Sequence, residues 1–142
     1  MVFKKESIED RLLKLDQALG VLEGYKGITS DSYLSDIKTQ WVVERGFIIA
    51  AEMIFDISAH ILSSVYREYR DEYEGIIRGI ADKGVISRTL MGELKGFGGF
   101  RNVLIHEYVT LDSRKVYDAL KGKLAALERF KKEIAQWVRL QG

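Results

Sequence analysis

The spacing of hydrophobic residues predicts a chain built almost wholly of helices. Between about Ser7 and Tyr25, apolar side chains recur every three or four residues, as they do on one face of an amphipathic helix. These positions are Ile8, Leu12, Leu15, Leu19 and Leu22. A cluster of capping residues that begins at Thr29 opens a second helical segment, which continues to about Tyr66 and has room for a short separate helix at its start. No useful length of sequence alternates apolar and polar residues, so no strand is predicted.

The second half of the chain continues the helical pattern. A third segment ends near Gly84, and a fourth begins at Ser87, a suitable N-cap. Three glycines between residues 96 and 99 predict a bent backbone or a close approach by another group. The last segment opens near Asp112 and has one apolar side as far as Val138. We therefore expect one all-α domain over residues 1–142, an antiparallel bundle of about five helices.

The second segment is apolar on nearly every side, with hydrophobic residues at most positions from 42 to 62. Such a helix must be covered all round, and the other helices of so small a protein can cover only part of it. We therefore predict that its remaining face meets a second copy of the chain. Glu52, Asp56 and His60 follow one another at intervals of four and form a polar line. This line is either a solvent-facing stripe or the rim of a subunit interface.

Composition narrows the choice of function. The chain has no cysteine, which excludes disulfides, thiolate metal sites and a cysteine nucleophile and is compatible with a reducing compartment. We expect no membrane-spanning segment and a cytoplasmic location. The net charge of +1 means that any contact with RNA must be local. The basic side of the last helix is either a solvated face or a track for a phosphate backbone. Its residues are Arg114, Lys115, Lys121, Lys123, Lys131 and Lys132.

The stretch RNVLIHEY, from Arg101 to Tyr108, carries the candidate chemistry. Histidine can give and take protons near neutral pH, so His106 can accept a proton from a ribose 2′-hydroxyl or donate one to the leaving oxygen. Arginine matches phosphate oxygens, so Arg101 can stabilise the charge that develops on phosphorus. Asn102 and Tyr108 can support them with hydrogen bonds. Together these groups suffice to cleave RNA without a metal.

A purely structural interpretation of the same residues is also open. Arg101 then pairs with Glu52 or Asp56 across the bundle, His106 is a hydrogen-bonded core residue, and Tyr108 packs against its neighbours. On a regular helix His106 would also point well to one side of Arg101. The spacing alone does not decide between the two interpretations.

The string from Phe100 to Tyr108 resembles the R-x4-H-x-Y signature of the HepT-like toxins, a branch of the HEPN superfamily of helical ribonucleases. The resemblance covers most of the chain, since the helix with Glu52, Asp56 and His60 and the final helix also resemble those of the family. The chain departs from the pattern at Gly98-Gly99, where one small residue is expected.

The resemblance implies a homodimer whose two motifs face each other across a cleft and form a composite, metal-independent endoribonuclease site. Arg101 and His106 would be the catalytic residues, and Asn102, Tyr108, Asp56 and Glu52 would support them. No metal or other cofactor is implied for this chain.

The resemblance also implies the toxin of a type II toxin–antitoxin pair. Its partner would be an MntA-type nucleotidyltransferase antitoxin that inhibits it by transferring AMP from ATP onto Tyr108. ATP would then belong to the partner, and this chain has no phosphate-binding GxxxxGK[ST] loop of its own.

Two alternatives belong to other classes. The first is a non-catalytic HEPN-type bundle that binds a nucleotidyltransferase or nucleic acid. The second is a metalloenzyme with His60, His106 and carboxylates as ligands, which the absence of HExxH or ExxH spacing disfavours. RNA cleavage in the presence of EDTA would separate the nuclease from both.

Overall fold

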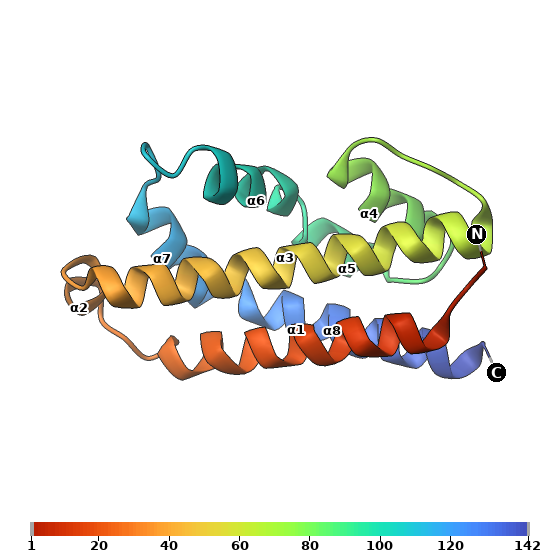
Figure 1. Cartoon of the computed structure of the whole chain (residues 1–142), viewed down its shortest axis with the longest axis horizontal. Coiled ribbons are helices and arrows are strands. Elements are labelled where there is room, and N and C mark those ends of the chain that lie inside the picture. The colour runs from red at the N-terminus through yellow and green to blue at the C-terminus, as the bar shows by residue number, and fades with distance from the viewer. Residues whose placement is uncertain (1, 142) are drawn as a thin grey trace.

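The computed structural model describes residues 2–141, which form eight helices and no strand (Figure 1). The helices are α1 (Lys5–Tyr25), α2 (Ser30–Leu34), α3 (Ile37–Tyr66), α4 (Tyr73–Asp82), α5 (Arg88–Glu93), α6 (Phe97–His106), α7 (Ser113–Gly122) and α8 (Leu124–Leu140). The prediction of an all-α bundle is therefore confirmed. There are more than the five predicted helices because the second, fourth and last predicted segments are each divided in two. They form α2 and α3, α5 and α6, and α7 and α8.

Helix starts follow the capping signals in the sequence. The side chains of Thr29, Asp36, Ser87 and Asp112 each accept a hydrogen bond from a backbone N–H in the first turn that follows them. Asp36 separates α2 from α3, which gives the short first helix that the sequence allowed. The division between α7 and α8 falls at Lys123, after a glycine, within an apolar stripe that runs on through both helices.

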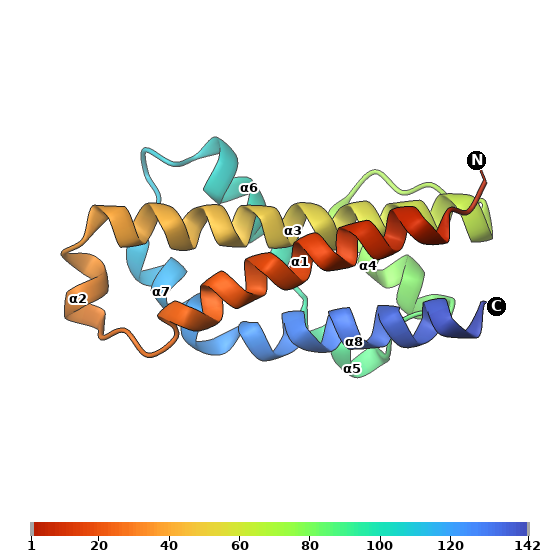
Figure 2. The same ribbon diagram turned by 60° about the horizontal axis from the view of Figure 1, so that its bottom comes forward.

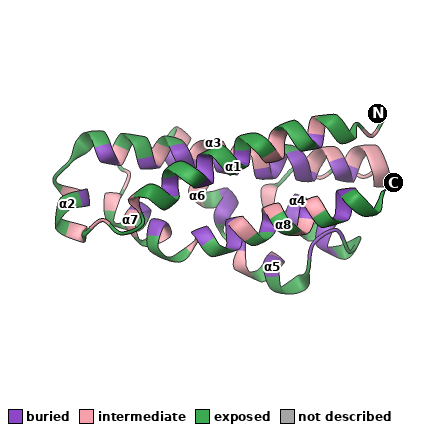
Figure 3. Cartoon of the chain, turned by 90° about the horizontal axis from the view of Figure 1, so that it is seen from below, coloured by how far each residue is buried: buried purple, intermediate pink, exposed green. Residues whose placement is uncertain are grey.

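The three longest helices, α1, α3 and α8, run along the long axis of the molecule (Figures 1 and 2). Helix α1 contacts both α3 and α8, and the shorter helices α4, α6 and α7 contact α3. One hydrophobic cluster extends from Ile8 in α1 to Val138 in α8. Buried residues line the inner faces of the helices, and exposed residues line the outer ones (Figure 3). Burial of this apolar surface is the main term that favours the fold.

Helix α3 is long and apolar enough, by length and composition alone, to cross a membrane. The core helix of a globular protein passes the same test, so this does not contradict the expectation of no membrane-spanning segment. In the structure, 44% of its most apolar 18-residue stretch is buried inside the bundle. Five other helices contact it. A central bundle helix has the same length and composition, and other helices of the chain cover part of its apolar surface.

The covering of α3 is incomplete at one end. Trp41 is 63% exposed and Val42 is 40% exposed, and on the neighbouring α1 Leu13 and Val21 are 60% and 47% exposed. Trp41, Val42 and Val21 line an open apolar groove between the two helices. The sequence predicted an uncovered face on this helix, and the single chain has one.

The glycines before and within α6 have separate roles. Gly96 has a φ of +85° and bends the chain into α6, and its N–H donates to Glu74 Oε1 at 2.8 Å. Gly98 lies against α4, because a Cβ built there would be 2.5 Å from the Cβ of Tyr73. A Cβ at Gly99 would meet nothing within 4 Å. Both the bend and the close approach expected from the sequence are present.

The neighbouring glycines provide a matched test of this packing. We expect Gly98→Ala to lower the thermal unfolding midpoint, because α6 and α4 must separate to make room for the methyl group. We expect Gly99→Ala to leave it unchanged or raise it, since alanine favours a helix over glycine by up to about 1 kcal/mol. Circular dichroism melts of the two variants check this, and equal effects would contradict the close contact.

Candidate active site

Arg101 lies in α6 and binds a carboxylate on α3. Its Nε and Nη2 both donate to Oε1 of Glu52, at 3.0 and 2.6 Å, and its Nη1 donates to Oδ1 of Asn102 at 3.1 Å. The Arg101 side chain is only 17% exposed, whereas the Glu52 side chain is 36% exposed. A guanidinium has five N–H donors, so two of them lie outside these three hydrogen bonds. The pair is therefore held at the surface with donors available for an anion.

A tyrosine of α4 packs against the face of the guanidinium. The Arg101 Cζ lies 5.1 Å from the centroid of the Tyr73 ring, within the range of a cation–π contact. The Tyr73 ring is itself 4.5 Å from that of Phe55 in α3. Sequence analysis missed this contact, because a tyrosine beside isoleucines on a helix looks like an ordinary core residue.

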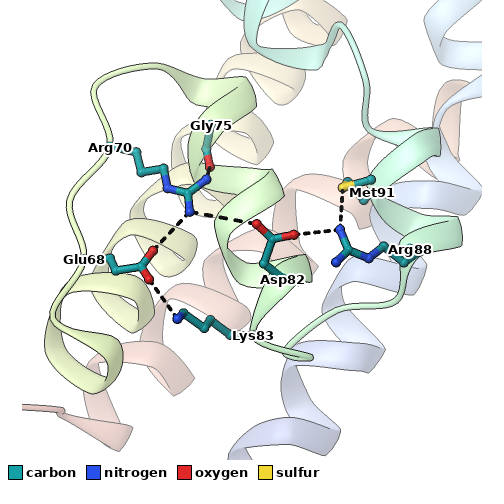
Figure 4. A network of polar contacts seen from close by, with 7 residues as sticks. All are labelled: Glu68, Arg70, Gly75, Asp82, Lys83, Arg88 and Met91. Atoms are coloured by element: carbon teal, nitrogen blue, oxygen red, sulfur yellow. Dashed lines mark hydrogen bonds and ion pairs between the residues drawn. The ribbon is translucent and has the colours of Figure 1, made fainter.

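A polar network holds α4 against the end of α3 (Figure 4). Glu68, in the loop after α3, pairs with Lys83 at 2.8 Å and with Arg70 at 3.2 Å. Arg70 also donates to the backbone oxygen of Gly75 in α4. Hydrogen bonds from Lys83 and Arg70 hold the pKa of Glu68 below its usual value. These contacts fix the helix whose first residue is Tyr73.

The other motif residues are accessible to solvent. His106, the last residue of α6, is exposed, and its imidazole makes no hydrogen bond or ion pair with any residue in the described part of the chain. Asn102 is exposed on α6, and Tyr108, in the turn that follows, is 70% exposed. The structural interpretation is thus right for Arg101, which pairs with Glu52, and wrong for His106 and Tyr108, which are not core groups.

The other two residues of the polar line, Asp56 and His60, face α1 and the segment before it. Asp56 lies 3.8 Å from Arg11, and burial raises its pKa above the usual value even though the Arg11 charge opposes this. His60 Nε2 accepts from the Lys4 N–H at 3.3 Å. Burial, with the nearby Arg11 and Lys4 charges, lowers the pKa of His60. Of the two candidate carboxylates, only Glu52 binds Arg101 directly.

No metal-ligand cluster accompanies this arrangement. Among residues 2–141, no group of three or more His, Cys, Asp or Glu side chains lies close enough together to hold a metal ion. The metalloenzyme alternative therefore lacks a set of ligands in that range.

Comparison with known proteins identifies the family. The family described as "Ribonuclease HepT-like" matches residues 15–134, most of the chain. The chain belongs to the HepT-like family. The resemblance proposed from the Arg101–Tyr108 motif and the expected enzyme class, a ribonuclease, are confirmed by this match.

Individual HepT-like relatives agree in sequence and fold. A protein named tRNA nuclease HepT, from Aphanizomenon flos-aquae, is 27% identical over 133 residues, which cover 92% of this chain and 89% of that protein. The Bacillus subtilis protein YutE, described as a cytosolic protein of unknown function, has a similar structure, with a TM-score of 0.85 and 22% identity over 99% of this chain and 95% of that one. A tri-AMPylated Shewanella oneidensis HEPN toxin in complex with an MNT antitoxin gives a TM-score of 0.81 and 21% identity, and the match covers 91% of this chain and 96% of that one.

The contact between Tyr73 and Arg101 in this HepT-like protein can be tested without any assay of activity. We expect Tyr73→Leu to speed the exchange of the Arg101 Nε–H with water by about two- to tenfold, because a cation–π contact contributes about 0.5–1 kcal/mol at exposed sites and more when desolvated. Tyr73→Phe keeps the ring and should leave the exchange unchanged. Side-chain ¹⁵N NMR measures both, and equal exchange in the two variants would mean that the ring does not hold the guanidinium.

Proposed function

We propose that this HepT-like protein is a toxin that cleaves RNA without a metal, with Arg101 and His106 as its catalytic residues. The observation that carries the proposal is the pairing of a fixed guanidinium and an exposed imidazole on the same short helix, α6. The Arg101 guanidinium is held in place to bind a phosphate, and the His106 imidazole is accessible for proton exchange with a substrate.

Each residue then has one step in the reaction. The ribose 2′-oxygen attacks the adjacent phosphorus, and the bond from phosphorus to the 5′-oxygen of the next nucleotide breaks. This gives a 2′,3′-cyclic phosphate and a free 5′-hydroxyl. His106 takes the proton from the 2′-hydroxyl or supplies one to the leaving oxygen, and the imidazole of a second copy or water makes the other transfer. The free N–H groups of Arg101 bind the phosphoryl oxygens as their charge grows, and Glu52 and Asn102 keep the guanidinium in place.

A second copy of the chain would complete the site. On an ideal helix, residues five positions apart point about 140° away from each other, so His106 of one chain is poorly directed toward its own Arg101. The exposed apolar groove at Trp41 and Val42 offers area for self-association. Two copies that meet through α3 would bring two α6 helices, each carrying both groups, to one substrate phosphate.

Tyr108 is proposed as the site of inhibition by an MntA-type nucleotidyltransferase antitoxin. Its side chain is 70% exposed in the turn directly after His106, so another enzyme can reach its hydroxyl. In that reaction the phenol oxygen attacks the α-phosphorus of ATP bound to the partner, pyrophosphate leaves, and AMP remains on the tyrosine. The added negative charge would repel an incoming RNA phosphate. The similar Shewanella toxin, which is AMPylated and in complex with its antitoxin, supports this assignment.

Two further proposals concern location and substrate. We place the protein in the cytoplasm, as the description of YutE as cytosolic supports. The relative named a tRNA nuclease makes tRNA the first RNA to test.

RNA cleavage in EDTA tests the proposed activity. Incubation with tRNA is expected to give fragments with 2′,3′-cyclic phosphate ends. His106→Ala should slow cleavage at least about 100-fold, the contribution typical of a general acid or base. Light scattering on the same samples should give the mass of two chains for both proteins. Absence of cleavage by the unsubstituted dimer, with Tyr108 unmodified, would favour the non-catalytic binding partner, and activity lost to EDTA would revive a metal mechanism.

Mass spectrometry tests the proposed modification. Coexpression with an MntA-type nucleotidyltransferase is expected to add one or more AMP units to the protein, and Tyr108→Phe should abolish the gain. Tyr69→Phe is the matched control, since Tyr69 is also highly exposed, at 84%, and should not affect the modification. Neutralised toxicity at unchanged mass would point instead to simple occlusion by the partner.

A further inference from the structure

A hollow opens beside α6 on the side that faces α7. Its apolar floor is formed by Phe97, Phe100 and Ala119. The rings of Phe97 and Phe100 stack with their centroids 6.0 Å apart, and Phe100 is only partly buried. Because Phe100 directly precedes Arg101, the hollow flanks the proposed cleavage site. None of the roles assigned above uses it.

Lysines from three separate segments surround this floor. Lys95 comes from the turn before α6, Lys115 from α7, and Lys123 from the junction of α7 and α8. Within residues 2–141, the ammonium groups of Lys95 and Lys115 have no hydrogen-bond or ion-pair partner. Lys123 donates to the backbone oxygen of Glu93 at 3.1 Å, which uses one of its three donors. Asp118 is the one carboxylate in the described lining, so the rim carries a net positive charge.

We propose that this hollow binds one nucleotide of the RNA strand beside the scissile phosphate, an inference that rests on the proposed function. The base lies on the apolar floor against Phe100, and its phosphate is bound by Lys95 and Lys115. Single-stranded nucleic acid is commonly held by this combination of an aromatic surface and nearby cations. Phe100 and His106 are six residues apart on α6, about 9 Å along its axis and about 120° apart around it, so a strand bound in the hollow must curve around the helix to reach the catalytic group.

RNA binding tests the role of the lysines. Lys95→Ala/Lys115→Ala is made in a His106→Ala background so that the RNA stays intact, and fluorescence anisotropy measures its affinity for a labelled single-stranded oligoribonucleotide. We expect the Kd to rise about five- to tenfold. The slope of log affinity against log salt concentration should become less negative by about 1.4. Two phosphate contacts are lost, and each contributes about 0.7 on a single strand.

A matched pair of lysines controls for the loss of charge. Lys5→Ala/Lys26→Ala removes two exposed lysines, from α1 and from the turn after it, outside the hollow, and should change the Kd less than twofold. An equal loss of affinity in both pairs would mean that the lysines act only through overall charge, and it would overturn the site.

A second variant tests the floor of the hollow and keeps every charge. Ala119→Leu places a larger side chain where the base is proposed to lie, and we expect weaker RNA binding with an unchanged salt slope. A melting curve confirms that the variant is folded. Unchanged affinity in a folded Ala119→Leu protein would overturn the placement of the base.

Two comparisons separate this inference from its rivals. If the unsubstituted protein cleaves RNA but Lys95→Ala/Lys115→Ala binds like the control pair, the hollow is wrong and the proposed activity stands. If no RNA is cleaved but the lysine pair still weakens binding selectively, the proposed activity is wrong and the proposed binding site stands.

Titration with AMP tests whether the hollow binds a free nucleotide instead of RNA. AMP binding that the lysine pair abolishes, with oligonucleotide affinity unchanged, would assign the hollow to a free nucleotide and overturn the RNA proposal.

Discussion

The ion pair between Arg101 and Glu52 determines how three helices meet. A guanidinium that is only 17% exposed must be paired, because a largely buried charge without a partner destabilises a protein by several kcal/mol. Glu52 supplies the partner from α3, Tyr73 supplies an aromatic face from α4, and the arginine itself comes from α6. These contacts require α6 to lie close to α4, and the missing side chain at Gly98 allows it. The pair thus links the packing of the bundle to the geometry of the candidate site.

The two candidate catalytic groups differ in how firmly the chain holds them. Arg101 is fixed by hydrogen bonds and by a ring, so it can stabilise charge in a transition state without first reorganising. His106 is exposed at the end of the same helix, and its imidazole makes no hydrogen bond or ion pair within residues 2–141. A proton carrier needs access to its substrate more than it needs a partner within its own chain. One chain therefore presents the parts of a site without enclosing one, which agrees with a site shared between two copies.

The sequence predicted the helices well because their signals are local. Apolar spacing and capping residues such as Thr29 and Ser87 act within one or two turns. The partner of Arg101 could be narrowed only to Glu52 or Asp56, which lie one turn apart on the same face of α3. The placement of α6 across α3 decides between them, and this depends on contacts far apart in sequence. Tyr73 could not be recognised for the same reason, and the division between α7 and α8 is hidden because the apolar stripe runs through it.

The polar line on α3 shows which part of that helix is engaged by the rest of its own chain. Glu52 pairs with Arg101 from α6, Asp56 lies near Arg11 of α1, and His60 accepts a hydrogen bond from the segment before α1. All three polar side chains thus contact other parts of their own chain. The line therefore helps to pack the bundle and does not only face solvent. The uncovered apolar surface lies toward the other end, at Trp41 and Val42. Because apolar burial drives most stable association, a second copy that packs on α3 would bury the surface at Trp41 and Val42.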